Sequence, residues 1–244
     1  MKAVILTAGL GTRFLPITKV VPKALLPIGN KPIIHLLVEE ALASGIKEIA
    51  IIISPNQNPI KEYFTNNPDF PNPITFIVQE EPLGDGHAIL QAKEFLADSP
   101  FAVLFGDDLI VSETPAIKQL LTLFEEKNAP ILATQRVPKE DISKYGVVSL
   151  TPPNQVTALI EKPSQKEAPS DFAVIGKYIC TPETIKYLEK AQASHSDGEI
   201  RLIDGFISML ADQKQLFALE IDGTRFDTGH PEGLLQAQIA FSEK

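Results

Sequence analysis

The chain has 244 residues, of which 44% are hydrophobic and 22% charged, the composition of a globular protein with a sizeable core. Its net charge of −9 argues against general nucleic-acid binding, and its longest uncharged stretches contain prolines, glycines or polar residues, which excludes a membrane span. A single cysteine excludes an internal disulfide, and the N-terminus lacks a signal-peptide core, so we expect a cytoplasmic protein.

The first 137 residues are predicted to alternate strands and helices. Apolar runs that end in glycine or polar residues predict strands at 2–7, 47–53, 74–79, 101–105 and 130–137. Helical spacing between proline and glycine signals predicts helices at 32–45, 59–66, 86–97 and 115–126. This order implies an α/β fold with a Rossmann-like, mostly parallel sheet covered by helices on both faces.

The pattern changes after Pro138. Strands are predicted at 145–150, 156–161 and 171–180 with no full helix between them, which indicates mixed or antiparallel pairing in a smaller, β-rich lobe. Helices at 182–193 and about 199–212, a strand at 215–221, an extended piece at 225–227 and a helix from 231 complete the chain. Because no linker is long enough to separate independent units, we expect one domain over 1–244, with halves at 1–137 and 138–244.

The loop after the first strand is glycine-rich and basic. Residues 1–38 hold five Lys or Arg and no acidic residue. Gly11 is followed by Thr12 and Arg13 instead of the Lys-Ser/Thr of a Walker A loop, and Phe14 fills the third small position of a dinucleotide fingerprint. Several prolines exclude a long helix here. The loop therefore suits a triphosphate held by loop amides and by side chains such as Arg13 and Lys23.

The motif "AGLGTRFLPITKVVPKALLPIGNKP" resembles the signature of the sugar-nucleotide pyrophosphorylases, a nucleotidyltransferase family, and is nearest to the bacterial UTP–glucose-1-phosphate uridylyltransferases. The resemblance continues in family order through "GDGHAI", "FGDDLI", "YGVV", "EKP", "AVIGKYI", "GEIRLIDGF" and "DTGHPEGLLQA". It implies that UTP and glucose 1-phosphate condense to UDP-glucose and pyrophosphate by in-line attack on the α-phosphorus, with Mg²⁺ as cofactor. The first half would then bind the nucleotide and the second half the sugar.

The resemblance also implies which residues carry the reaction. The nucleophile is a phosphate oxygen that is ionised near pH 7, so catalysis needs positioning and charge neutralisation instead of a general base. The implied catalytic residues are Arg13, Lys23, Asp107, Lys162 and Asp227, of which Asp107 and Asp227 would hold the metal. Asp107 ends a predicted strand, at the sheet edge where ligands bind. Its neighbour Asp108 is interpreted as a turn or cap residue.

The implied binding residues fall into two groups. Those for the nucleotide are Ala8, Gly9, Gly11, Gln79 and Gly84, where the Gln79 amide can pair with the imide edge of uracil. Those for the sugar are Gly146, Glu161, Lys162 and Gly176, and alternation along a strand places Glu161 and Lys162 on opposite faces, although Pro163 can twist the end. Glu199 matches a position near the sugar, or is an acid near a helix start.

Several alternatives remain open. Thymine has the same imide edge as uracil, so a dTTP-dependent thymidylyltransferase is the nearest rival. A non-catalytic sugar-nucleotide-binding protein and a Rossmann dehydrogenase are others. The chain departs from the uridylyltransferases at Ala24, where they usually carry Glu, and in a short segment between Phe64 and Ile74. We expect small-molecule substrates, no nucleic-acid or membrane partner, and a possible homo-oligomer.

Overall fold

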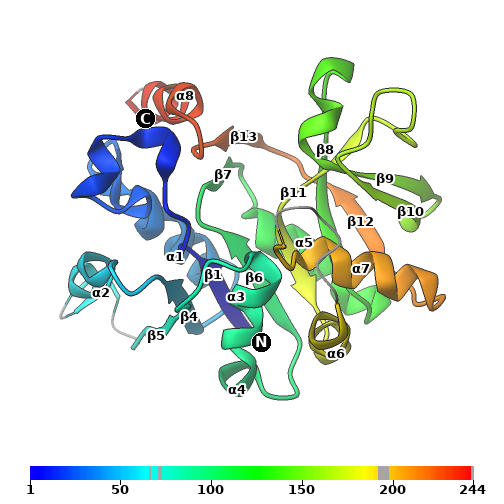
Figure 1. Cartoon of the computed structure of the whole chain (residues 1–244), viewed down its shortest axis with the longest axis horizontal. Helices are drawn as coiled ribbons and strands as arrows, with labels where there is room; N and C mark the ends of the chain where they lie inside the picture. The colour runs from blue at the N-terminus through cyan, green and yellow to red at the C-terminus, as the bar shows by residue number, and fades with distance from the viewer. Residues whose placement is uncertain (66, 71–72, 192–197, 243–244) are drawn as a thin grey trace.

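The fold is built on one large sheet, seen in a computed structural model that describes residues 1–65, 67–70, 73–191 and 198–242. Its strands are β1 (Lys2–Leu6), β4 (Glu48–Ile53), β5 (Thr75–Val78), β6 (Phe101–Phe105), β8 (Ile131–Arg136), β9 (Gly146–Thr151), β10 (Gln155–Glu161), β11 (Phe172–Cys180) and β12 (Phe217–Glu220). They lie in the order β5-β4-β1-β6-β11-β8-β12-β10-β9 (Figure 1). Strands β10 and β11 run against the others, so the α/β fold with a mixed sheet is confirmed, with parallel pairing around β1 and mainly antiparallel pairing from β11 to β9.

Helices cover both faces of this sheet. They are α1 (Ile33–Ala43), α2 (Asn58–Phe64), α3 (Asp85–Gln91), α4 (Lys93–Leu96), α5 (Ala116–Lys127), α6 (Pro182–Lys190), α7 (Leu202–Ala211) and α8 (Pro231–Ser242). The helix expected at 86–97 is interrupted at Ala92, and the expected end of the helix at 182–193 lies outside the described residues. No helix among the described residues has the length and apolar character needed to cross a bilayer.

The alternation of side chains along the strands divides the core into two layers. In β1, Val4 points to one face while Ala3 and Ile5 point to the other, and all three are fully buried. Helices α1, α2 and α5 pack with Ala3 and Ile5, whereas α3, α4, α6 and α7 pack with Val4 (Figure 1). Because both faces are covered, β1, β4 and β6 are apolar apart from the first residues of β1 and β4, as parallel strands in α/β proteins are.

The carboxyl ends of the central strands meet at one edge of the sheet. Leu6 at the end of β1 aligns with Ile52 in β4 and with Phe105 in β6. The chain moves outward from β1 to β4 and β5, and then returns to the other side of β1 with β6. Such a reversal of strand order opens a crevice above the carboxyl ends, where ligands bind in α/β proteins.

The loop after β1 contains no long helix. It forms three short 3-10 turns at Thr12–Phe14, Ile17–Lys19 and Lys23–Leu25, followed by the small hairpin of β2 (Pro27–Ile28) and β3 (Lys31–Pro32). The Thr18 hydroxyl donates a hydrogen bond to the Gly11 carbonyl at 2.8 Å, which ties the turns together. The glycine-rich segment is therefore held as a compact loop at the crevice.

A two-stranded ribbon joins the middle of the chain to its C-terminal part. Strand β7 (Asp108–Val111), which the sequence did not predict, pairs antiparallel with β13 (Thr224–Asp227). Their register places Asp108 opposite Asp227. The backbone N–H and the hydroxyl of buried Thr228 both donate to the Asp107 carbonyl at 2.8 Å. Asp107 and Thr228, which are 121 positions apart in the sequence, are thereby fixed beside each other.

Candidate active site

Two carboxylates converge beside Gly229. A Cβ atom at this glycine would lie 2.8 Å from both Asp107 Oδ2 and Asp227 Oδ1. The β7–β13 ribbon supplies Asp227, and the turn between β6 and β7 supplies Asp107. Any side chain at position 229 would therefore occupy the space between the two oxygens. The structure brings together the two acidic residues that the sequence assigned to a metal.

A lysine neutralises one of these carboxylates. Lys23 Nζ lies 2.5 Å from Asp107 Oδ2 and donates a hydrogen bond to it. Burial alone would raise the pKa of Asp107, but the positive charges of Lys23 and Arg225 outweigh this effect and lower it. Asp107 is consequently ionised at neutral pH and available to a cation.

The crevice holds two cavities that meet at Asp107. A cavity of about 510 Å³ extends toward β9–β11, and one of about 260 Å³ extends toward β1 and β5. Phe105, Asp85 and Asp107 line both. Molecules bound in the two cavities would thus meet at the carboxylate that can hold a cation.

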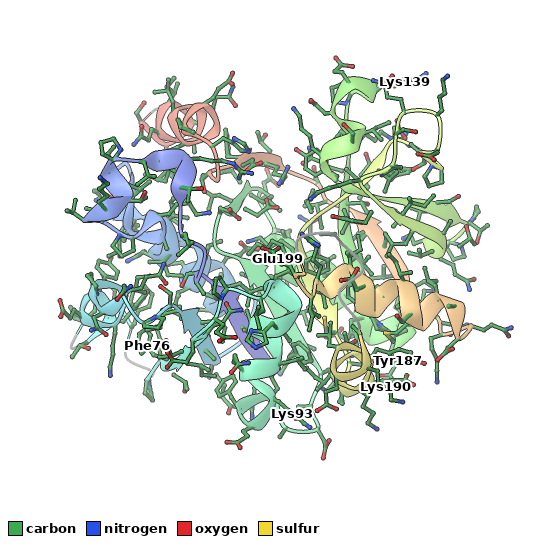
Figure 2. The ribbon with its side chains drawn as sticks, in the orientation of Figure 1. Phe76, Lys93, Lys139, Tyr187, Lys190 and Glu199 are labelled. Carbon is green, nitrogen blue, oxygen red and sulfur yellow. The ribbon has the colours of Figure 1, made fainter. Side chains whose placement is uncertain are left out.

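The smaller cavity collects most of the residues expected to bind the nucleotide. It is lined by Ala8, Gly9, Gln79 and Gly84 from that group, and also by Lys23 and by Glu199, which was expected near the sugar but does not line the larger cavity. Figure 2 shows Glu199 near the centre of the view, where the segment before α7 faces the loop before α3. Gly11 does not line this cavity, since a Cβ there would meet Thr18 and the Lys23 side chain. Its position supports the loop instead.

The base-binding end of the smaller cavity is shaped by Gln79 and Gly84. Gln79 Nε2 donates to the Gly84 carbonyl at 3.0 Å and lies 3.0 Å from His87 Nδ1. Gly84 has a φ of 102°, and a Cβ there would lie 2.2 Å from the Ile200 carbonyl oxygen. The glycine is therefore required by the close approach of Ile200 as well as by its left-handed backbone.

The larger cavity contains the residues expected at the sugar and its phosphate. Arg13, Asp107, Gly146, Glu161, Lys162, Gly176 and Asp227 all line it. The interpretation that Glu161 and Lys162 face opposite sides is wrong, because Lys162 has a φ of 46° and leaves the strand path before Pro163. Lys162 Nζ lies 3.7 Å from Glu161 Oε1, so both side chains reach the same cavity.

The interpretation of Asp108 as a turn or cap residue is also wrong. Asp108 is 3% exposed and begins β7. Its Oδ2 accepts a hydrogen bond from the Gly176 N–H at 2.6 Å, and its Oδ1 accepts one from Arg225 Nε at 2.7 Å. Gly176 is needed for this contact, since a Cβ there would lie 2.9 Å from Asp108 Oδ2.

Several cavity residues were not identified from the sequence. Asp85, Arg201 and Arg225 line the larger cavity, together with Lys144, Tyr145 and His230. Asp85 accepts a hydrogen bond from the Leu202 N–H at 2.6 Å, and burial raises its pKa to about 6. Signals were available: Arg225 stands two residues before Asp227 and so shares its side of a strand, and four of the others stand within the quoted motifs "GDGHAI", "YGVV", "GEIRLIDGF" and "DTGHPEGLLQA".

The donor set fits a hard divalent cation. Asp107 and Asp227 offer two carboxylates, and no cluster of three His, Cys, Asp or Glu side chains suited to a metal occurs within the described part of the chain. Magnesium is commonly held by one or two carboxylates, with substrate phosphates and water as its other ligands. Asp107 Oδ2 also accepts from Lys23, and Asp227 Oδ1 accepts from the Gly229 N–H at 3.0 Å, so a bound ion would share these carboxylates with donors of the protein.

The crevice fold and the paired aspartates define a nucleotide-dependent transferase. The family described as nucleotidyl transferase matches residues 2–244, and the chain belongs to this family. It is 38% identical to the UTP–glucose-1-phosphate uridylyltransferase of Staphylococcus epidermidis strain ATCC 35984, over all of this chain and 92% of that protein. The identity to the Bacillus subtilis enzyme of the same name is also 38%, over 99% of this chain and 90% of that protein.

Solved structures agree with this assignment. The crystal structure of a UDP-glucose pyrophosphorylase in complex with UDP-glucose superimposes with a TM-score of 0.92. The two proteins are 33% identical, and the match covers 99% of this chain and 98% of that one. The family resemblance and the α/β fold predicted from the sequence are confirmed, and the protein is a nucleotidyltransferase.

Proposed function

We propose that the protein transfers a uridylyl group from UTP to glucose 1-phosphate, which forms UDP-glucose and releases pyrophosphate. One structural observation carries this proposal: two cavities of different lining meet at Asp107. A reaction that joins two phosphorylated substrates needs such a junction, because the attacking oxygen must approach the α-phosphorus in line with the leaving group. The uridylyltransferase names of the relatives support the choice of substrates.

The smaller cavity is proposed to bind UTP. Backbone amides near Ala8 and Gly9 would face the phosphates, with Gly11 supporting the loop. Gln79 uses its NH₂ group on Gly84 and His87, which leaves its carbonyl oxygen to accept the N3–H of uracil. Thymine carries the same N3–H, whereas cytosine has an acceptor at N3. Gln79 thus favours UTP and dTTP over CTP.

The larger cavity is proposed to bind the sugar phosphate. Glu161 can accept hydrogen bonds from sugar hydroxyls, and Gly146 lies against its carboxylate, since a Cβ there would be 3.1 Å from Glu161 Oε2. Lys162, which is half exposed beside Glu161, is proposed to bind the phosphate. The sugar would extend toward Gly176 on β11, which lines the same cavity.

Charge neutralisation is the main contribution of the protein to the reaction. The phosphate nucleophile is already ionised, so no side chain has to remove a proton from it. Arg13, expected at the triphosphate, lines the larger cavity and not the smaller one, so it would neutralise phosphate charge on that side of the junction. Lys23 stands at the junction and would screen the two substrates from each other. Mg²⁺ held by Asp107 and Asp227 would supply further neutralisation of the phosphate oxygens.

The remaining expectations concern the whole chain. We propose one domain over 1–244, whose segment 1–137 supplies most of the nucleotide cavity and whose segment 138–244 supplies most of the sugar cavity. We further propose a cytoplasmic enzyme that acts on small molecules and does not bind nucleic acid or membranes. The net charge of −9 supports the absence of binding to these polyanionic surfaces.

A substrate panel tests the proposal. Purified protein with Mg²⁺ is mixed with UTP, dTTP or CTP and with glucose 1-phosphate or another sugar 1-phosphate, and pyrophosphate release is measured. We expect the largest kcat/KM with UTP and glucose 1-phosphate, and loss of turnover in Asp107→Ala with an unchanged circular dichroism spectrum. A higher kcat/KM with dTTP would reassign the nucleotide. Tight UDP-glucose binding without any turnover would show a binding protein instead of an enzyme.

A further inference from the structure

Arg225 is a cation of the larger cavity to which the family resemblance gave no role. It lies in β13 opposite Ile110 of β7, two residues before Asp227. Alternate residues of a strand point to the same side, so Arg225 and Asp227 face the cavity together. The Arg225 side chain is 12% exposed and lines the larger cavity but not the smaller one.

The guanidinium group of Arg225 is held in one orientation by the protein. Its Nε donates to Asp108 Oδ1 at 2.7 Å, and its Nη1 donates to the Tyr145 hydroxyl at 3.3 Å. The guanidinium carbon also lies 5.4 Å from the centre of the Tyr145 ring, a cation–π contact. Asp108 is itself fixed by the Gly176 N–H. An arginine held on several sides loses little entropy when it binds a ligand.

The free edge of this guanidinium matches a phosphate group. An arginine has five N–H donors, and the bonds to Asp108 and Tyr145 use two of them. Planar donor pairs of this kind bind phosphate oxygens in a bidentate manner. Burial alone would lower the pKa of Arg225, but Asp108 offsets this effect and the pKa is raised. The group therefore remains charged.

The position of Arg225 selects one phosphate among those of the substrates. Its Nε contacts Asp108, the residue after Asp107, and it stands two residues before Asp227 in β13, which places it near the junction of the cavities. The sugar end of the larger cavity is marked instead by Gly146, Glu161 and Ile203, which pack together. The phosphate of a sugar 1-phosphate would lie between this sugar end and the junction of the two cavities.

We propose that Arg225 binds the phosphate of the sugar 1-phosphate and that Asp108 is its positioning residue. This inference rests on the proposed function, since it assumes that the larger cavity takes the acceptor substrate. In the product, the same phosphate is the one attached to the sugar in UDP-glucose. Arg225 would therefore bind glucose 1-phosphate and UDP-glucose, but not UTP or pyrophosphate.

Steady-state kinetics in both directions test this assignment. In Arg225→Gln we expect the KM for glucose 1-phosphate and for UDP-glucose to rise about 10- to 100-fold, the effect of losing a hydrogen bond to a charged group. The KM for UTP and for pyrophosphate should change less than about twofold. Arg225→Lys should lie between wild type and Arg225→Gln, because lysine keeps the charge but lacks the fork. Asp108→Asn should raise the same two KM values by a smaller factor.

Two further variants keep the test interpretable. Arg225→Gln leaves the buried Asp108 without its charged partner, so the double variant Asp108→Asn/Arg225→Gln provides a folded alternative if the single variant melts early. Arg136→Gln is the matched control, because Arg136 is 55% exposed and pairs with Asp171. Isothermal titration with UDP-glucose adds a binding measurement that does not depend on turnover. The same loss of affinity for UDP-glucose is expected in Arg225→Gln and in the double variant Asp108→Asn/Arg225→Gln.

Two results would overturn the inference. One is an active Arg225→Gln enzyme whose KM for glucose 1-phosphate equals that of wild type. The other is an equal rise in the KM for UTP, which would indicate a general structural effect. Both results require an active wild-type enzyme. If wild-type protein releases no pyrophosphate from UTP and glucose 1-phosphate, the proposed function fails, which is a different outcome.

Discussion

Asp107 and Asp227 lie on either side of Gly229, and each presents an oxygen 2.8 Å from the point where a Cβ of residue 229 would stand. This relationship depends on the β7–β13 ribbon and on Thr228, which binds the Asp107 carbonyl through both its N–H and its hydroxyl. The backbone thus fixes the separation of the two carboxylates before any ligand binds. Preorganised charges of this kind cost little reorganisation during a reaction.

Gly229→Ala is the most direct test of this geometry. The new methyl group would occupy the space between the two carboxylates, so we expect kcat to fall about 10²- to 10³-fold, the scale found when a preorganised electrostatic contact is removed. The Mg²⁺ concentration needed for half-maximal rate should rise as well. Gly205→Ala in α7 is the control, since its Cβ would contact Leu188 and Gly205 lines neither cavity. Equal metal dependence of Gly229→Ala and wild type would contradict the metal assignment.

Gln79→Leu tests the base-binding site. Gln79 is 5% exposed and its amide nitrogen is already engaged by Gly84 and His87, so its carbonyl oxygen is the group left for uracil N3–H. We expect the KM for UTP to rise about tenfold, the value of one net hydrogen bond, with little change in the KM for glucose 1-phosphate.

The ratio of kcat/KM for UTP to that for CTP should fall in the same Gln79→Leu variant, because the group that rejects the cytosine N3 acceptor is gone. Gln91→Leu is the matched control, since Gln91 is exposed and its amide nitrogen contacts the far ring nitrogen and the carbonyl of His87. An unchanged nucleotide preference in Gln79→Leu would remove Gln79 from the base site.

The elements of this fold were largely predictable, but the contacts between distant elements were not. The run from Phe101 to Phe105 was identified as a strand because its residues are uniformly apolar. β7 was missed because its Asp108 follows another aspartate and a glycine, a pattern typical of turns. The burial of Asp108 depends on Arg225, 117 positions away, and no local pattern reports such a pairing.

The active site was also predictable only in part. Asp107 and Asp227 were identified from short motifs. Asp85, which also stands inside a motif, "GDGHAI", and Arg225 were missed because their roles depend on which cavity they line. Lys162 shows a third case. Strand alternation placed it opposite Glu161, and a left-handed backbone at φ 46° reversed that orientation. Periodicity describes regular elements and fails where one ends.

The pH dependence of stability tests the burial of Asp85. Removal from water raises its pKa from 3.8 to about 6, although the Leu202 N–H and Arg201 oppose the effect. Below about pH 4 the carboxyl is protonated in both folded and unfolded chains, so it carries no penalty. Above about pH 6 it is ionised in both, and the folded state bears the full cost. The contribution of Asp85 to the free energy of unfolding therefore falls as the pH rises from about 4 to about 6.

Asp85→Asn should remove this dependence while its amide oxygen still accepts from Leu202. Between pH 4 and pH 7.5 we expect the free energy of unfolding of the variant to rise relative to that of wild type by about 1 to 3 kcal/mol, as measured by urea unfolding at each pH. Asp171→Asn, at an exposed ion pair with Arg136, should show a much smaller change. If the free energies of unfolding of Asp85→Asn and wild type changed with pH in the same way, the raised pKa of Asp85 would be contradicted.

The last prediction concerns a charged pair inside the core. Lys177 of β11 is fully buried, and its Nζ lies 2.9 Å from Glu40 Oε2 in α1. Glu40 Oε1 in turn accepts a hydrogen bond from the Ile117 N–H at the start of α5. The pair therefore links the sheet to two helices on one face, directly behind Gly176 of the larger cavity.

Lys177→Met should lower the free energy of unfolding by about 3 to 5 kcal/mol, because it leaves the Glu40 carboxylate buried without its cation. The double variant Glu40→Gln/Lys177→Met should recover most of this loss, since an amide can still accept from Ile117 and no buried charge remains. Urea unfolding of wild type, both single variants and the double variant gives the coupling energy directly. If the two single losses simply add in the double variant, the two side chains do not stabilise each other and the charge pairing is unimportant for the fold.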